Sequence, residues 1–137
     1  MLERFSVNAR RIIFFANYEA GNLGSPYVEP EHLLLGLLRQ DTQLAGYLLR
    51  SLASIRDKIE ARRNAVAKPP QSSDLPLSAA SQRVLANAAI VAENRSEMVD
   101  NAHIFIGLRR EEKSFAAELI SEALQNTDRR SPPRSKR

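Results

Sequence analysis

The two histidines are the residues whose chemistry first suggests a site. His32 and His103 are the only histidines in the chain, and imidazole is a common zinc ligand. A zinc site needs further ligands, but the chain contains no His-Glu-x-x-His spacing and no cysteine. Each histidine instead opens a similar apolar stretch. We therefore expect both rings to fill space and accept hydrogen bonds where the two halves of the fold meet, and we expect no metal.

Other catalytic arrangements are missing from the sequence. No nucleophile, base and acid occur together at a recognisable spacing, and neither do paired carboxylates. The phosphate-binding pattern Gly-x-x-x-x-Gly-Lys-Ser/Thr is also absent from this chain of five glycines. We predict that the chain is not an enzyme and uses no cofactor.

The positive charge is concentrated at one end. The chain has a formal net charge of +4, and residues 128–137 alone account for +4, so residues 1–127 are neutral. A basic tail attracts polyanions weakly and in a salt-sensitive way. One hypothesis is therefore a basic-tailed helical protein that associates with nucleic acid or acts as an accessory regulator, although the neutral body disfavours nucleic-acid recognition.

The apolar content indicates a cytoplasmic protein. The run at residues 12–16 is too short to span a bilayer, and no cleavage site of the signal-peptide type follows it. The absence of cysteine excludes a disulfide scaffold. We expect a location in the cytoplasm and no membrane partner.

Two parts of the sequence resemble each other. Residues 6–20 match residues 78–92 at an offset of 72, and the matching apolar positions share one face of a helix. HLLLGL at residues 32–37 matches HIFIGL at residues 103–108 at an offset of 71. Three such matches in the same order, including residues 45–49 with 116–120, indicate a tandem duplication.

The duplication predicts an all-α fold of two helical repeats related by a pseudo-two-fold axis, with about seven or eight helices. We place repeat one at 1–67, a linker at 68–75, repeat two at 76–127 and a disordered basic tail at 128–137. Pro and polar residues in the linker interrupt the helical pattern. The expected helices are 6–20, a short helix from residue 30, 42–51, 55–65, 78–92, a short helix from residue 101, and 113–124.

Several residues are expected to set the helix ends. Ser6 and Ser78 are the predicted N-caps of the long helices, and Asn101 is the predicted cap of the helix that contains His103. Gly21 and Gly24 are expected to end the first helix. The remaining expected signals are Pro30 at a helix start, and Gly36 and Gly107, which are predicted to let two helices approach closely.

Two aromatic residues cannot both face the core. Phe14 and Phe15 are neighbours on a helix, so their side chains point about 100° apart. Their counterparts in the second repeat are Ala86 and Asn87. We predict an apolar groove between the repeats with Phe14, Phe15 and Tyr18 as contributors; plain core filling is the alternative.

The same stretches resemble a known family. LERFS at residues 2–6, ARR at residues 9–11 and PEHLLLGLL at residues 30–38 resemble the Clp N-terminal repeat domain of Clp-type unfoldases, and the resemblance covers residues 2–124. It implies a bacterial interaction module that binds a Clp ATPase, adaptors or client segments and does no chemistry. No ATPase sequence is present, so the resemblance implies a free-standing homologue if the chain is the whole protein, or the N-terminal part of an unfoldase if it is a fragment.

The resemblance also implies a binding corner. Some relatives of the Clp-C type bind phosphoarginine through a capping hydroxyl and a carboxylate, and Ser6 and Glu31 match those two residue types. In the second repeat Ser78 matches, but Ala102 stands where the carboxylate is expected. The alternative role of Glu31 is to favour the positive end of its helix.

Overall fold

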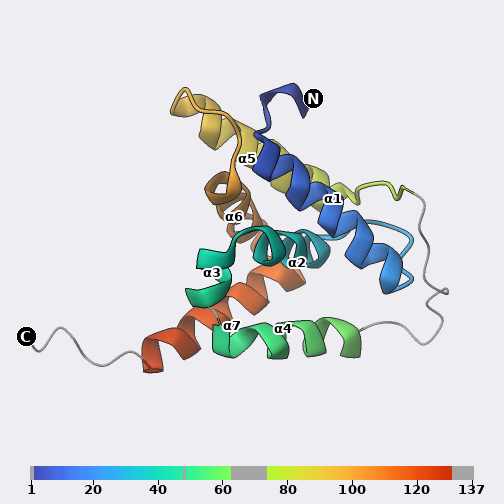
Figure 1. The fold of residues 1–137 in the computed structure, drawn as a ribbon, viewed down its shortest axis with the longest axis vertical. Coiled ribbons are helices and arrows are strands. Elements are labelled where there is room, and N and C mark those ends of the chain that lie inside the picture. Colours follow the sequence, from blue (N-terminus) through green and yellow to red (C-terminus); the bar gives the residue numbers. More distant parts are fainter. Residues whose placement is uncertain (1, 48, 63–73, 131–137) are drawn as a thin grey trace, which may run out of the picture.

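The computed structural model describes residues 2–47, 49–62 and 74–130, and these residues form an all-helical fold (Figure 1). Within them lie a short 3-10 helix and seven α-helices, which confirms the predicted fold class. The elements are η1 (Leu2–Arg4), α1 (Val7–Asn22), α2 (Pro30–Gln40), α3 (Thr42–Tyr47), α4 (Leu49–Ala61), α5 (Ala79–Asn94), α6 (Asn101–Arg110) and α7 (Phe115–Arg130).

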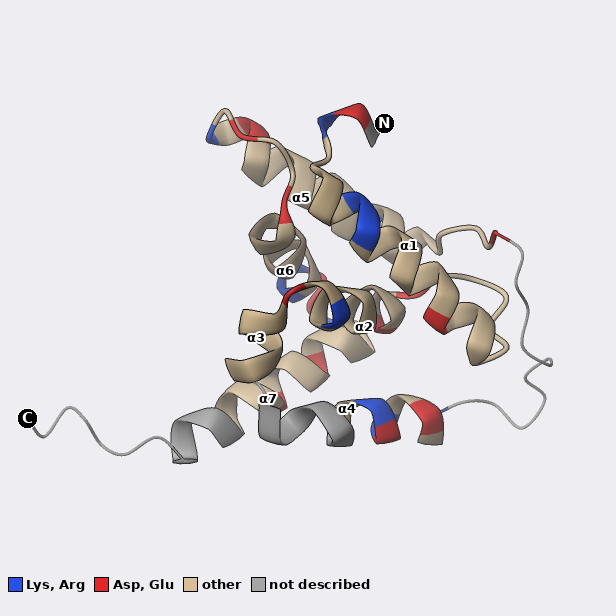
Figure 2. Cartoon of the chain, in the orientation of Figure 1, with Lys and Arg blue, Asp and Glu red and all other residues tan. Residues whose placement is uncertain are grey.

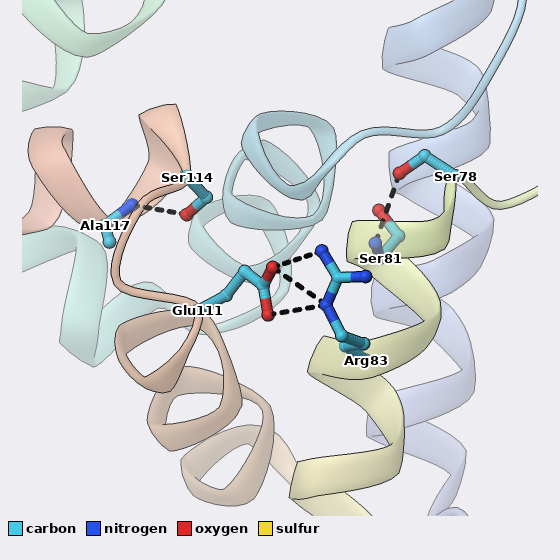
Figure 3. Close-up of polar contacts among 6 residues, drawn as sticks. All are labelled: Ser78, Ser81, Arg83, Glu111, Ser114 and Ala117. Atoms are coloured by element: carbon cyan, nitrogen blue, oxygen red, sulfur yellow. Dashed lines mark hydrogen bonds and ion pairs between the residues drawn. The ribbon is translucent and has the colours of Figure 1, made fainter.

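Each long helix starts with a serine, as the sequence predicts. The Ser6 hydroxyl accepts the backbone N–H of Ala9 at 3.0 Å, and the Ser78 hydroxyl accepts that of Ser81 at 3.1 Å. Figure 3 shows the second of these caps. The prediction for α6 is wrong by one residue, because its N-cap is Asp100 and Asn101 is already helical.

The two long helices end in the same way. At the end of α1 the backbone N–H of Gly24 donates to the carbonyl of Gly21, and that of Ser25 donates to the carbonyl of Ala20, both at 3.0 Å. This pair of hydrogen bonds defines a Schellman motif. Gly24 has φ 71°, so it is the residue that ends α1, whereas Gly21 lies inside the helix. In α5 the equivalent left-handed residue is Ser96, with φ 56°.

The later helices differ from the predicted ranges. Instead of helices at 42–51 and 55–65, α3 ends at residue 47 and α4 begins at residue 49, since residues 49–61 contain no Gly or Pro. Ser114 caps α7 by accepting the N–H of Ala117 at 3.0 Å, and α7 continues to Arg130, three residues into the expected tail. Most of the predicted linker and residues 131–137 of the tail lie outside the described residues.

The repeats exchange their first segments. Ser6 donates its backbone N–H to Val99, and Val99 donates to Arg4, both at 2.8 Å. At the related place Ser78 donates to Val28 at 3.0 Å, and Val28 donates to Pro76 at 2.9 Å. Each repeat thus supplies a short extended segment that pairs in parallel with the loop between the first two helices of the other repeat.

One hydrophobic core fills the space between the helices. It contains buried apolar residues from both repeats, including Ile12, Leu34, Leu85 and Ile104. In Figure 1, α1 and α5 form the upper part of the molecule, α2 and α6 the middle, and α4 and α7 the base. The helices α2 and α6 therefore lie between the upper and the lower helices.

Charged side chains of both signs lie along the surface. In Figure 2, stretches with Lys or Arg and stretches with Asp or Glu are both spread over several of the described helices. One pair joins α5 to the end of α6: the guanidinium of Arg83 donates to the Glu111 carboxylate at 2.6 and 3.0 Å (Figure 3). Among the described helices, none is both long enough and apolar enough to cross a bilayer.

Candidate functional site

A groove runs between α1 and the extended segment that precedes α5. It has a volume of about 390 Å³ and is therefore large enough for several side-chain atoms. The residues that line it are Ile13, Phe14, Asn17, Tyr18, Asn22, Val28, Asp74, Leu75 and Leu77. Because α1 belongs to repeat one and residues 74–77 join the predicted linker to repeat two, the groove lies at the junction of the two repeats.

Two of the three predicted aromatic residues line this groove. Phe14 is 68% exposed and Tyr18 is 52% exposed, values far above those of core side chains. Phe15 is only partly exposed and does not line the groove; its ring meets that of Phe14 edge-on at 5.7 Å between centroids. Plain core filling is thus excluded for Phe14 and Tyr18.

An arginine from α2 positions the aromatic residues. The guanidinium carbon of Arg39 lies 4.6 Å from the ring centroid of Phe15 and 5.2 Å from that of Tyr18. Cation–π contacts of this length are attractive. Arg39 therefore contacts one ring that lines the groove, that of Tyr18, and one that does not, that of Phe15.

A buried carboxylate holds that arginine, and the sequence analysis missed it. Glu19 is 4% exposed, and its oxygens lie 3.5 Å from Arg39 and 3.0 Å from Arg56, so that it joins α1, α2 and α4. The matching residue of the second repeat is Val91. A charged residue at an otherwise apolar repeat position was the available signal, because a carboxylate buried in a core needs a cationic partner.

The serine and glutamate of the expected binding corner have different neighbours. Ser6 donates its hydroxyl to Asp100 at 2.7 Å, so it lies at the start of α6. Glu31 lies in the first turn of α2, and the segment just before α2 pairs with Ser78. Within the described residues no contact joins Ser6 to Glu31. The exchange of segments makes Ser78, not Ser6, the capping serine beside the start of α2.

Glu31 has an unusual environment for a surface carboxylate. Burial raises the pKa of its side chain, and the nearby charge of Glu29 raises the pKa further. Hydrogen bonding to its own backbone and the charge of Arg62 act in the opposite direction. A carboxylate destabilised in this way favours a cationic or hydrogen-donating partner.

The two histidines form equivalent contacts. Nδ1 of His32 accepts the backbone N–H of Glu29, and Nδ1 of His103 accepts that of Asp100, both at 2.9 Å. Each histidine is at the third helical position and accepts the backbone N–H of the N-cap residue. A Glu or Gln side chain makes the same hydrogen bond in a capping box. His103 also bonds to Glu97 through Nε2 at 2.9 Å. These bonds lie within one repeat rather than between repeats.

Burial governs the protonation of the first histidine. It lowers the pKa of His32 to about 4, so the ring is neutral at physiological pH. Among the described residues, no group of three or more His, Asp or Glu side chains is arranged to hold a metal ion. The arrangement of both rings is that of helix capping.

The paired glycines lie where helices meet. A Cβ atom at Gly36 would lie 2.4 Å from the carbonyl oxygen of Ile12, and one at Gly107 would lie 2.4 Å from that of Val84. Both neighbours are backbone atoms, which cannot move aside as a side chain can. This is the geometry that a close approach of α2 to α1, and of α6 to α5, requires.

Comparison with known proteins gives a family match over most of the chain. The family model described as the Clp repeat (R) N-terminal domain matches residues 4–123. The chain is similar to the chloroplastic chaperone proteins ClpD2 (34% identity over 79% of this chain) and ClpC2 (30% over 88%) of Oryza sativa subsp. japonica. It spans only 12% and 14% of the lengths of those two relatives.

Solved structures show the same fold. The N-terminal domain of the caseinolytic protease associated chaperone ClpD from Arabidopsis thaliana is 25% identical and matches with a TM-score of 0.60, over 93% of this chain and 97% of that one. A chain from preliminary structural investigations of a malarial protein secretion system matches with a TM-score of 0.72 over 91% and 85%, at 23% identity. The latter likeness concerns the fold alone. The two rice relatives have chloroplast names, so they do not support the expected bacterial origin.

Proposed function

The chain belongs to the family of the Clp repeat (R) N-terminal domain, and from this premise we propose that it is a non-catalytic module that binds proteins for a Clp-type chaperone or protease. Its partners in this proposal are a Clp ATPase, its adaptors, or segments of client proteins. The site of binding is the groove between the repeats. Location in the cytoplasm of its host stays a prediction, since the rice relatives are chloroplastic.

The observation that carries the proposal is the exposure of aromatic side chains beside a groove. Phe14 and Tyr18 are 68% and 52% exposed on the same helix and line a cavity of about 390 Å³. Apolar side chains gathered at a concave surface are typical of binding sites, and Tyr is enriched among the few residues that carry most of the binding free energy at protein interfaces. An exposed arrangement of this kind contributes little to the folding of the chain itself.

The support for a non-catalytic role comes from the residues that would otherwise do chemistry. Both histidine rings are used in helix caps, and Glu19 is held by two arginines. Glu31 lies in the first turn of α2, where the charges of Glu29 and Arg62 act on it in opposite directions. The contacts of these side chains are those of helix capping and ion pairing. The sequence also has no phosphate-binding loop.

Capture of partners tests the proposal. The full chain is immobilised and exposed to lysate of its host, and retained proteins are identified by mass spectrometry and then titrated in purified form. We expect a Clp ATPase, its peptidase or an adaptor, with a Kd of tens of micromolar or tighter. Phe14→Ala should weaken the interaction by about tenfold, whereas Ile90→Ala, the equivalent of Tyr18 in repeat two, should leave it unchanged.

Two results would contradict the proposal. One is a reproducible set of partners that contains no member of a Clp system. The other is retention that is lost at moderate salt and is unaffected by Phe14→Ala, which would indicate a purely electrostatic interaction of the basic tail.

A further inference from the structure

The extended segment at the groove has one edge that pairs with Val28 and a second edge, called here the open edge, on which only some backbone groups are bonded to side chains. Pro76 and Ser78 point their backbone groups toward Val28, with bonds of 2.9 and 3.0 Å. Backbone groups of successive residues in an extended segment point in opposite directions. Those of Leu75 and Leu77 therefore point away from Val28. On this side the Leu75 N–H donates to Asn17 of α1 at 2.8 Å, and the Leu77 carbonyl accepts from the Gln82 side chain of α5 at 3.2 Å.

Two backbone groups on the open edge have no partner among the residues that the structure describes. Within the described residues no hydrogen bond is made by the Leu75 carbonyl or by the Leu77 N–H. Together they offer one acceptor and one donor, separated as the Pro76 carbonyl and the Ser78 N–H are separated on the other edge. On that other edge a single residue, Val28, satisfies both groups. One residue of an incoming extended chain has the groups to do the same here.

The walls of the groove indicate which side chain that residue carries. Ile13, Phe14, Tyr18 and Leu75 present apolar surface, which favours an apolar side chain over a polar one. Asp74, which is exposed, is the one charged residue among the described lining residues. The complementary charge on a bound segment is therefore positive.

From these contacts we propose that the groove binds an extended peptide segment in which an apolar residue is next to Lys or Arg. The apolar side chain lies between α1 and Leu75, its backbone adds to the open edge of residues 75–77, and the basic side chain meets Asp74. The mode is β-strand addition, in which main-chain bonds give affinity and pockets give selectivity. This inference rests on the proposed function and specifies the segment that the module binds.

The pseudo-symmetry predicts a single such groove. At the related place in repeat two, Phe14 is replaced by Ala86, Tyr18 by Ile90 and Asp74 by Leu2. The counterpart of the open edge begins within η1, which is coiled as a 3-10 helix rather than extended. One peptide per chain is therefore expected, although the fold itself is duplicated.

Fluorescence anisotropy with synthetic peptides tests the inference. The probe is a labelled peptide Gly-Ser-Ser-Leu-Lys-Ser-Gly, compared with a version that has Glu in place of Lys and one that is N-methylated at Leu. We expect one peptide per chain, binding weakened about two- to fivefold by Glu and about three- to tenfold by the N-methyl group, which removes a donor.

Variants of the full chain complete the test. Asp74→Lys should reverse the order so that the Glu peptide binds better, Phe14→Ala should weaken all peptides, and Ile90→Ala is the matched control. Equal binding of all three peptides to the unaltered chain, or no change of order with Asp74→Lys, would overturn the inference. If a Clp partner is captured while the peptides fail these tests, the proposed function stands and only the peptide mode is wrong.

Discussion

The backbone N–H of Ser6 donates to the carbonyl of Val99 at 2.8 Å, so the first residues of repeat one are hydrogen-bonded to repeat two. The reciprocal bond from Ser78 to Val28 is 3.0 Å. Phe5 and Val99, which meet at the first of these places, are 2% and 1% exposed. The two repeats therefore complete each other's core as well as packing together.

The first prediction is that neither repeat folds alone. A fragment of residues 1–62 lacks the partner of Phe5, and a fragment of residues 74–137 lacks the partner of Leu77. Each should show little helix by circular dichroism, and an equimolar mixture should recover the helix content of the whole chain. A cooperative thermal transition of either fragment by itself, as a monomer, would contradict this prediction.

The second prediction concerns the helix contact at Gly36. Gly36→Ala should lower the free energy of unfolding by about 2–3 kcal/mol, because the new Cβ would meet backbone atoms of α1. Gly46→Ala is the control, since a Cβ there meets nothing within 4 Å, and it should raise stability by up to about 1 kcal/mol through helix propensity. Chemical denaturation of both variants measures the difference, and equal effects would show that the contact is not tight.

The third prediction compares the two helix ends. Ser96 adopts a left-handed backbone at φ 56°, which disfavours any residue with a Cβ, whereas Gly24 occupies the equivalent place in repeat one. Ser96→Gly should therefore stabilise the fold by about 0.5–1 kcal/mol, and Gly24→Ser should destabilise it by about 1 kcal/mol. Melting temperatures measured side by side test the opposite signs.

The fourth prediction addresses the carboxylate between α1, α2 and α4. Glu19→Gln keeps the shape of the side chain but removes the charge that two arginines contact, so it should cost about 2 kcal/mol. Glu122→Gln, which affects the exposed pair with Lys58, should cost less than about 1 kcal/mol. Should both variants cost the same in urea denaturation, the Glu19 cluster would be energetically no different from a surface ion pair.

The fifth prediction is a dependence of stability on pH through His32. Because its pKa is about 4 when folded and 6.5 when unfolded, the unfolded chain takes up the proton first as the pH falls. The free energy of unfolding should therefore fall by roughly 3 kcal/mol between pH 6.5 and pH 4 on account of this residue. Its contribution becomes constant only when the pH is well above 6.5, where the ring is neutral in both states.

A single substitution isolates that contribution. His32→Gln removes the titrating group and keeps an acceptor for the Glu29 N–H, as a capping box does. Its stability should vary less with pH over this range than that of the unaltered chain, whatever its stability at neutral pH. Identical slopes for the two proteins would exclude His32 as the cause.

Local signals in the sequence predicted the helix starts well. A hydroxyl before an apolar-periodic run identified Ser6 and Ser78, and a proline identified the start of α2, because these signals act within one turn of a helix. The assignment of Asn101 as a cap failed since the neighbouring Asp100 is an equally good cap. The extension of α7 was missed because polarity alone does not end a helix.

Contacts over long sequence separations could not be predicted in the same way. The repeat pattern indicates two similar units but not which segment of one pairs with which loop of the other. As a result, the predicted binding corner pairs Ser6 with Glu31 of the same repeat. In the structure the Ser6 hydroxyl instead donates to Asp100 of the other repeat. The Glu19 cluster was missed for the same reason, as Arg56 comes from α4, 37 residues away.

The exchange of segments makes the contact between the repeats reciprocal, because the segment before the first helix of each repeat pairs with the loop of the other. This is the geometry of an isologous two-fold interface, which in many proteins joins two copies of a subunit but here lies within one chain. Two halves of one chain need not be identical, so the two ends of the interface can carry different side chains. Phe14 and Tyr18 of repeat one accordingly stand where repeat two has Ala86 and Ile90.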